Sequence, residues 1–326
     1  MNYCRRYLGF KLLLSLLVVM SIAVCNVQAA KLMSVNVLDK DYLIVNLADG
    51  EIFHEEINAQ GKPQDHAEYY NPAMNIRAAV DVTSWTITSS NDGNYADSGQ
   101  NPFACFRKKK LNGHAQTTWN PALNPPNGDW NYEYTYEHWV YLQLSESLQE
   151  GATYELTIGS DVNSDTATVS FTFDSYNNVS EAIHVNLTGY YTDAPHKAAD
   201  LYYWMGDGGG RNYSGFEGTP VYLYNVSNQT STPVGEVHFW QSSAVDVHVF
   251  NLTASDVWNI DFSSVSTPGT YRLVVEGVGC SQDFEIFDEA YKDPFAVSLL
   301  GYYYMRMGES NANMYPPPRT PMYIIG

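Results

Sequence analysis

The stretch TATVSFTF, residues 166–173, alternates polar and apolar side chains without a break. Ala167, Val169, Phe171 and Phe173 fall on one face of an extended chain, because successive strand residues point to opposite faces. The stretch therefore predicts a half-buried β-strand. Similar alternating stretches occur earlier in the chain, and we predict further strands at 42–47, 85–88, 139–144 and 154–158.

A second set of short alternating stretches follows residue 180. They are separated by Gly, Pro, Asn and Asp, which is the pattern of an all-β sandwich. Seven such strands in roughly 105 residues match an immunoglobulin-like domain in size. Helical periodicity is nearly absent between residues 33 and 287, so we predict an all-β fold with two immunoglobulin-like β-sandwiches in tandem. The expected strands of the second sandwich lie at 182–187, 199–204, 221–225, 234–240, 257–262, 271–276 and 283–287.

One internal similarity supports two sandwiches. Tyr154 and Tyr271 each follow a turn and open an alternating strand, and each has an apolar residue six positions upstream, Leu148 and Val265. A tyrosine in this setting can bond its hydroxyl back to the backbone just upstream, which is called a tyrosine corner. We predict such a corner at both positions, although an ordinary turn before a strand remains the alternative.

The chain changes character near its end. Asp293 can cap a helix, Pro294 suits its first position, and Gly308 can end it. The sequence thus predicts one C-terminal helix, whose large side chains recur at helical spacing: Phe295, Leu299, Tyr302 and Tyr303. These side chains need a partner, and the sequence reaches Gly326 before supplying one. We therefore expect the chain to be a fragment of a longer protein.

The first thirty residues have the pattern of a secretory signal peptide. Arg5 and Arg6 precede an apolar run at 12–24, which is shorter than the ~20 residues of a membrane span. Residues 27–29 offer a small-residue cleavage site. We expect a cleaved signal peptide at 1–30, a secreted, periplasmic or cell-surface protein, and no membrane span. Cys25 as a lipid-anchor cysteine is a minor alternative.

Charge excludes one class of partner. The formal net charge is −19, with 36 acidic and 17 basic residues. Such a surface repels phosphate backbones, so we expect no nucleic-acid partner. A neutral polysaccharide is compatible with it, as is a charge that serves solubility alone. After signal cleavage only Cys105 and Cys280 remain, in different predicted domains, and we expect two free thiols.

The candidate residues for carbohydrate contact are Trp119 and Trp130. Both sit among Pro, Asn and Gly residues, where an exposed ring could stack on a sugar face. Packing in a core or loop is the commoner role of large aromatic side chains. We find no motif for a metal site, a cofactor or catalytic residues, and we expect none of the three.

Four segments between residues 181 and 308 resemble one enzyme family. They are VNLTGY with DAPHKA (185–190, 193–198), WNIDFS with TPGTYRL (258–263, 267–273), the last strand at 284–287, and the helix at 295–308. In this order they resemble the immunoglobulin-like domain and the first catalytic helix of glycoside hydrolase family 9 cellulases. Leu187 departs from the pattern, since the family usually has Gln there.

The resemblance implies a parent enzyme that acts on β-1,4-glucan by inverting hydrolysis. Its (α/α)6 catalytic barrel would be the partner of this chain, and polysaccharide a further one. The family's Asp-x-Gly-Asp motif is missing here, so we expect the chain alone to be inactive, which leaves its status as an enzyme uncertain. A stand-alone secreted carbohydrate-binding or adhesion protein with two sandwiches is the alternative.

The expected domains follow from these boundaries. After the signal peptide come an N-terminal sandwich at 31–178, the cellulase-type immunoglobulin-like domain at 179–290 and the start of a truncated catalytic domain at 291–326. Within the first sandwich, DKDYLIV (39–45) and RKKK (107–110) look similar to an extra N-terminal module in some exported bacterial members of the family. From its charge alone, the basic run is expected to be a solvated strand edge.

Overall fold

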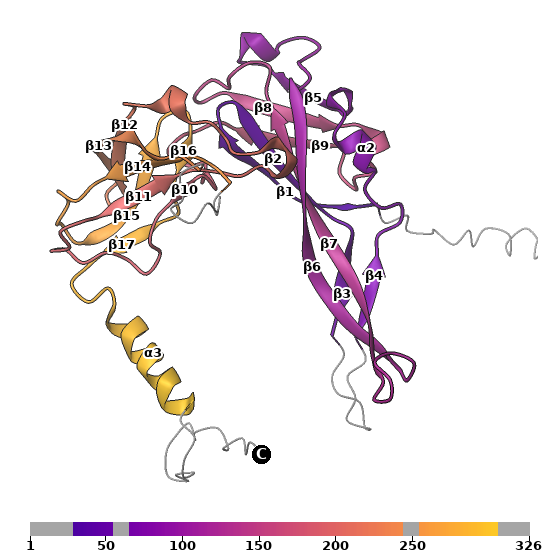
Figure 1. Cartoon of the computed structure of the whole chain (residues 1–326). Coiled ribbons are helices and arrows are strands. Elements are labelled where there is room, and N and C mark those ends of the chain that lie inside the picture. The colour runs from indigo at the N-terminus through magenta and orange to yellow at the C-terminus, as the bar shows by residue number, and fades with distance from the viewer. Residues whose placement is uncertain (1–28, 55–64, 244–253, 306–326) are drawn as a thin grey trace, which may run out of the picture.

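The computed structural model describes residues 29–54, 65–243 and 254–305 (Figure 1). The fold is all-β with a C-terminal helix, as predicted. The first sandwich contains a sheet of four antiparallel strands, a sheet of three and a two-stranded ribbon. In sheet order these are β1 (Lys31–Asp39), β2 (Tyr42–Ala48), β7 (Asp129–Gln143) and β6 (Ala104–Asn120); β5 (Trp85–Ser89), β8 (Thr153–Ile158) and β9 (Thr168–Thr172); and β3 (Gly50–Phe53) with β4 (His66–Tyr69).

The first core lies between the four-stranded and three-stranded sheets. Alternate residues of β5 and β8 face it, including Trp85, Ile87, Tyr154 and Leu156, all at most 1% exposed. The short helix α2 (Ile76–Ala79) adds Ala78 and Ala79 at one side. The period-two pattern that predicted these strands is therefore the pattern of burial.

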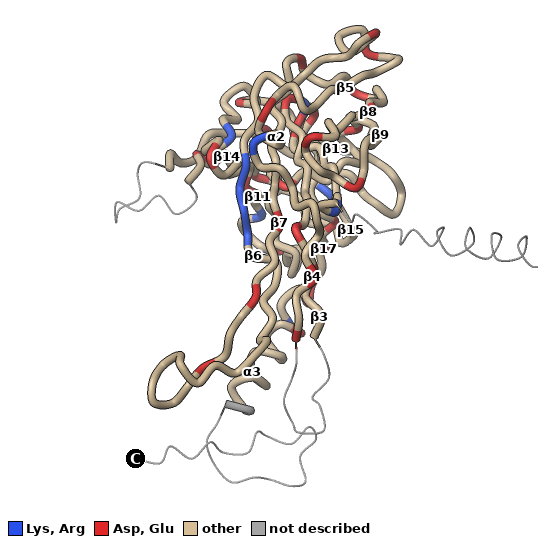
Figure 2. The backbone as a smooth tube through the Cα atoms, turned by 90° about the vertical axis from the view of Figure 1, so that its right-hand side faces the viewer, with Lys and Arg blue, Asp and Glu red and all other residues tan. Residues whose placement is uncertain are grey.

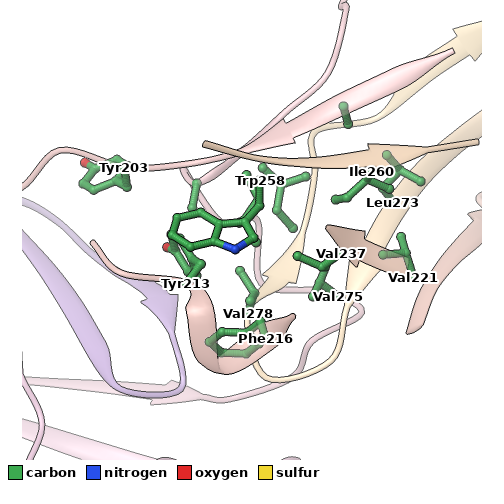
Figure 3. Packing of buried hydrophobic residues seen from close by; sticks show 14 of the residues in the cluster. Tyr203, Tyr213, Phe216, Val221, Val237, Trp258, Ile260, Leu273, Val275 and Val278 are labelled. Atoms are coloured by element: carbon green, nitrogen blue, oxygen red, sulfur yellow. The ribbon is translucent and has the colours of Figure 1, made fainter. Parts of the chain in front are cut away.

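The second sandwich is a continuous antiparallel sheet that folds over itself. Its strands follow the order β10 (Ile183–His184), β11 (Ala198–Leu201), β14 (Val257–Asp261), β13 (Thr230–Gln241), β12 (Pro220–Asn225), β15 (Gly269–Val275) and β16 (Gly279–Cys280), with β17 (Phe284–Ile286) also on β15. The strand β13 makes the fold-over, since its first half pairs with β12 and its second half with β14. Between the layers, Trp258 packs against Tyr213, and Val237, Ile260 and Leu273 are buried beside them (Figure 3).

Both predicted tyrosine corners are present. The Tyr154 hydroxyl accepts a hydrogen bond from the Gln149 N–H at 2.7 Å, and the Tyr271 hydroxyl donates one to the Thr267 carbonyl at 3.1 Å. In each corner the tyrosine hydroxyl is bonded to a backbone group four or five residues upstream, as predicted. The hydroxyl of Tyr154 also donates to Asp92 at 2.6 Å, so this corner is tied to a second loop.

The part of the four-stranded sheet that lies between the two sandwiches is buried on both faces. Every residue of β2 is buried, and its side chains go alternately to the two cores: Leu43 and Val45 to the first, Tyr42 and Ile44 to the second. On β7, Val140 and Leu142 face the first core and Tyr141 the second. The sheet is thus a wall shared by both sandwiches.

Two elements project from the joined sandwiches on the same side (Figure 1). One is the far half of the β6–β7 hairpin. The other is the helix α3 (Lys292–Met305), which the sequence predicts at 294–307. Its predicted end at Gly308 lies outside the described residues. The helix stands clear of the second sandwich, and its apolar side chains are 45–73% exposed at Phe295, Val297, Leu299, Leu300 and Tyr302.

Candidate functional site

The most elaborate arrangement of charged side chains joins the two sandwiches. Arg211, in the second sandwich, reaches the turn between β1 and β2 in the first. Its Nε lies 2.8 Å from one Asp39 carboxylate oxygen and its Nη2 lies 3.2 Å from the other. The same Nη2 lies 2.9 Å from Asp41 Oδ2. Asp39 is fully buried, so this fork-shaped pairing is what compensates its charge.

Aromatic rings enclose the guanidinium of Arg211. Its central carbon lies 4.6 Å from the ring centre of Tyr42 and 5.2 Å from that of Tyr213. Burial raises the pKa of Asp39, against the lowering effect of the Arg211 charge. Burial opposes the charge of Arg211 as well, but the charge and hydrogen bonds of Asp39 raise the pKa of the arginine. Each of the two charges is therefore stable in this buried position only because the other is present. Either partner alone would be a buried, uncompensated charge.

A second contact between the sandwiches surrounds Lys108. Its Nζ lies 5.3 Å from the ring centres of Trp139 and Tyr203 and 5.6 Å from that of Tyr141. Burial lowers the pKa of Lys108, and the attraction of Glu181 works against that shift. The Tyr203 hydroxyl donates to Glu181 at 2.7 Å and lies 3.3 Å from the Tyr141 hydroxyl. A chain of hydroxyl groups thus crosses from the shared sheet to the second sandwich.

The loop η4 (Gly206–Gly208) sits directly on β6. Its Asp207 accepts a hydrogen bond from the Arg107 N–H at 2.5 Å. A Cβ on Gly206 would lie 2.4 Å from the Arg107 carbonyl, and one on Gly208 would lie 2.6 Å from the Phe106 ring. The glycines of η4 therefore permit close approach of two backbones.

Both segments of the first sandwich that resemble an extra N-terminal module contribute to this junction. Residues 39–45 and 107–110 hold Asp39, Asp41, Arg107 and Lys108. The interpretation of the basic run as a solvated edge is right in that β6 is an edge strand and Lys109 and Lys110 are exposed. It is wrong for Lys108, which is half-buried under rings. Arg211 carried no local signal, because its partners lie 170 and 172 residues away.

The two candidate carbohydrate-contacting residues lie together at the tip of the β6–β7 hairpin. Trp119 and Trp130 are register partners, and their rings meet edge to face with centres 5.6 Å apart. Trp119 is 48% exposed and Trp130 is half-buried. The sequence placed both in loops, whereas they close the ladder between the two strands. Trp139 is half-buried at the junction.

Other chemistry is limited in the described residues. No group of three or more His, Cys, Asp or Glu side chains there could hold a metal ion. Cys105 and Cys280 are free thiols, as predicted, and burial raises their pKa values to about 12 and about 11. Within the same residues, no helix has both the length and the apolar character to cross a membrane.

Comparison with known proteins identifies the second sandwich. Residues 178–280 match the family model of the cellulase N-terminal immunoglobulin-like domain. The second sandwich is therefore similar to that domain. A stretch of 65 residues is also 45% identical to Endoglucanase D of Acetivibrio thermocellus. The match covers 20% of this chain and 10% of the endoglucanase, so the chain shares only a small part of that relative's length. The resemblance to the N-terminal region of family 9 cellulases is confirmed at this level.

Solved structures give looser overlaps. A metagenome-derived glycoside hydrolase family 9 endoglucanase overlaps 41% of this chain and 22% of its own, at 22% identity and a TM-score of 0.32. The N-terminal part of the bacterial S-layer protein SbsC overlaps 79% of this chain and 44% of its own, at 12% identity and a TM-score of 0.26.

Within the cellulase-type domain, the segment that carried the resemblance is a rigid turn. Lys197 is only 1% exposed, and its ammonium group donates to the carbonyl oxygens of Thr192 at 3.0 Å and Ala194 at 2.9 Å. The Tyr190 hydroxyl donates to the Ala198 carbonyl at 2.8 Å. These bonds satisfy backbone groups that a tight turn would otherwise leave unpaired.

Proposed function

We propose that this chain is the non-catalytic N-terminal portion of a secreted family 9 glycoside hydrolase. In the full-length parent, a catalytic (α/α)6 domain would act on β-1,4-glucan by inverting hydrolysis. The proposal rests above all on one observation: the cellulase-type domain continues from β17 directly into the exposed apolar helix α3.

The helix α3 carries the argument for a catalytic partner. Phe295, Leu299 and Tyr302 lie at successive helical turns on one side, and Val297 and Leu300 lie on others. A helix that is apolar around most of its circumference belongs in the interior of a larger helical domain. The cellulase-type domain contacts the chain just before the helix, where the Tyr291 hydroxyl accepts a hydrogen bond from Asn186 Nδ2 at 2.9 Å and the Tyr291 ring centre lies 5.1 Å from that of Tyr191. A barrel of packed helices would cover the exposed apolar side chains of α3.

The junction supports a buttressing role for the two sandwiches. The shared sheet, the Arg211 pair and the η4 contact hold the first sandwich against the cellulase-type domain. A catalytic domain attached through α3 would therefore have a rigid base of two sandwiches.

The gene gives the decisive test. We expect the reading frame beyond codon 326 to continue and to encode an Asp-x-Gly-Asp motif, which would supply the general base of inverting hydrolysis. A stop codon with no barrel-like sequence after it would contradict the proposal.

Activity tests the non-catalytic part separately. Inverting hydrolysis needs two carboxyl groups ~6.5–9.5 Å apart with water between them. We expect the chain as given to release no reducing ends from carboxymethyl-cellulose. Measurable hydrolysis by the purified chain would show that it holds a catalytic pair of its own.

Export is part of the proposal, and we place the cleaved signal peptide within residues 1–30. Ala30 is fully buried in the first core, and its N–H donates to the Asn163 carbonyl at 2.9 Å. Cleavage after Ala29 would keep this contact, so we expect N-terminal sequencing of the exported protein to begin at Ala30. A secreted protein that retains its first residues would contradict a cleaved signal.

A further inference from the structure

The far half of the β6–β7 hairpin forms an arm with one covered face. The arm consists of residues 113–120 and 129–136 with the connection between them. The ribbon of β3 and β4 packs on one face, beneath which Ala115 and Thr135 are fully buried. A Cβ on Gly113 would lie 2.7 Å from an Ile52 side-chain carbon, so the ribbon and the hairpin are in close contact.

The other face of the arm is open and lined with rings. Residues alternate along β7, so Trp130, Tyr132, Tyr134 and Tyr136 all lie on this face, and Trp119 joins them through its pairing with Trp130. Tyr132 is 42% exposed and Tyr134 is 43% exposed, close to the 48% of Trp119. An exposed row of aromatic side chains on a soluble protein marks an interaction surface.

These rings are held in place before any ligand arrives. Gly128 is buried under Trp119, and a Cβ on it would lie 2.5 Å from the indole ring. The Tyr132 and Tyr134 rings are nearly parallel, with centres 6.5 Å apart, and His114 lies 6.1 Å from Tyr132. Ordering a side chain on binding costs free energy, so rings that are already packed form a favourable binding surface.

The charge of the open face indicates the kind of ligand. The paired positions on this face of β6 and β7 carry no acidic residue, although the whole chain has 36 acids. Asp129 and Glu133 fall on the alternate positions of β7. Lys109, at the base of the face, lies over the Tyr136 ring at 3.4 Å. The arm is almost free of charged residues in Figure 2, in contrast to the basic run on β6 above it. A neutral ligand fits this surface better than a charged one.

The spacing of the rings favours a polymer with a regular repeat. Alternate residues of one strand present side chains about 6.8 Å apart along a straight line. Protein partners are instead held by a few anchors that fill pockets. A pyranose ring offers an apolar C–H face to an aromatic ring, and its hydroxyl groups remain at the edges for polar neighbours such as His114 and Gln116.

We propose that the open face of this arm binds a single neutral β-glucan chain lying along β7, with sugar rings stacked on Trp119, Tyr132 and Tyr134. The choice of a β-glucan rests on the proposed function, whereas a neutral glycan follows from the arm itself. The arm and α3 project on the same side, so a chain bound here would lie on the side where the catalytic domain attaches (Figure 1).

Affinity electrophoresis of the full chain tests this site. In native gels containing hydroxyethyl-cellulose, which is soluble and neutral, we expect retardation of the wild-type chain and none with dextran, an α-linked glucan. Each of Trp119→Ala, Tyr132→Ala and Tyr134→Ala should weaken binding about fivefold, and the triple variant should migrate as in a gel without polymer. Phe103→Ala and Trp240→Ala are matched controls, since both rings are exposed elsewhere and should leave retardation unchanged.

Several outcomes would overturn the proposal. They are a wild-type chain that is not retarded, a triple variant that still is, equal retardation by dextran, or equal losses in the two controls. Thermal unfolding of each variant should match wild type, because the rings are on the surface. A concentration-dependent dimer that the triple variant abolishes would assign the face to a second copy of the chain instead. None of these results bears on the reading frame beyond codon 326, so the two proposals can fail separately.

Discussion

The strands β6 and β7 run through two different environments. Near the body they form the junction, where Lys108 and Tyr141 are covered by the cellulase-type domain. Farther out they form the arm, where Tyr132 and Tyr134 face solvent. The same kinds of residue occur in both halves. What differs is the cover, which makes the junction a place where substitutions cost stability and the arm a place where they cost binding.

The largest effect should come from Arg211→Ala. It leaves Asp39 buried without a partner, and we expect a loss of about 3–5 kcal/mol in the free energy of unfolding, measured with urea at neutral pH. The matched control is Asp283→Ala, because Asp283 pairs with Arg272 at the surface, 2.8 Å apart, where such a pair is worth about 1 kcal/mol or less. Equal losses in both variants would contradict the importance of burial at the junction.

Two glycines with the same backbone strain allow a sharper comparison. Gly206 has φ +67° and Gly128 has φ +74°, but a Cβ would meet the backbone of β6 at the first and only the Trp119 ring at the second. We expect Gly206→Ala to destabilise by about 1–3 kcal/mol more than Gly128→Ala, because a carbonyl cannot move aside as a surface ring can. Calorimetry would measure the difference. Tryptophan fluorescence should change for Gly128→Ala, and a larger loss of stability there would reverse the comparison.

Removal of single hydroxyl groups should give a smaller contrast. Tyr141→Phe breaks the hydroxyl chain to Tyr203 inside the junction, and we expect it to cost about 1 kcal/mol. Tyr134→Phe removes an exposed hydroxyl and should change stability by less than about 0.5 kcal/mol. Denaturant titrations of both variants would measure this difference in the free energy of unfolding. If Tyr134→Phe proved the more harmful, the arm would be covered in solution.

The smallest effect concerns thiol chemistry. With a pKa of about 11, Cys280 is a thiolate in only about one molecule per thousand at pH 8, and Cys105, with a pKa of about 12, even less often. We expect iodoacetamide to leave both unmodified in the folded chain lacking residues 1–29, as judged by intact mass. A cysteine introduced on the arm by Thr118→Cys should react readily. Rapid labelling of Cys280 in the native protein would mean that its strand opens.

The sequence predicted the strands and turns that depend on residues close together in the chain. Alternation located β8, β9 and β15, and turn spacing located the corners at Tyr154 and Tyr271, because each of these rests on local geometry. It located β6 only at the basic run 107–110, because the outer half of this strand is open to solvent and carries no apolar alternation. It missed the pairing of Asp39 with Arg211, because no pattern in a single sequence connects residues so far apart.

The candidate site was predicted only in part. Trp119 and Trp130 were chosen for exposure in loops, but they are paired on strands, and Tyr132 and Tyr134 belong to the same row. The missing information was the register, which places these rings on one face. Trp139, in the same aromatic segment, lies on the opposite face and belongs to the junction.

The ion pair at the junction joins residues that are made at different times during synthesis of the chain. Asp39 is synthesised 172 residues before Arg211. The first sandwich is completed by β9, which ends at Thr172, and the second by β17, which ends at Ile286, so at about 5–20 residues per second the first waits ~6–23 s for its partner. During that interval the surface that will become its docking face is bare to solvent. This face carries the apolar side chains of Tyr42, Ile44 and Tyr141, and Asp39, Asp41 and the basic run at 107–110 are the charged groups beside them that oppose aggregation until the second domain arrives.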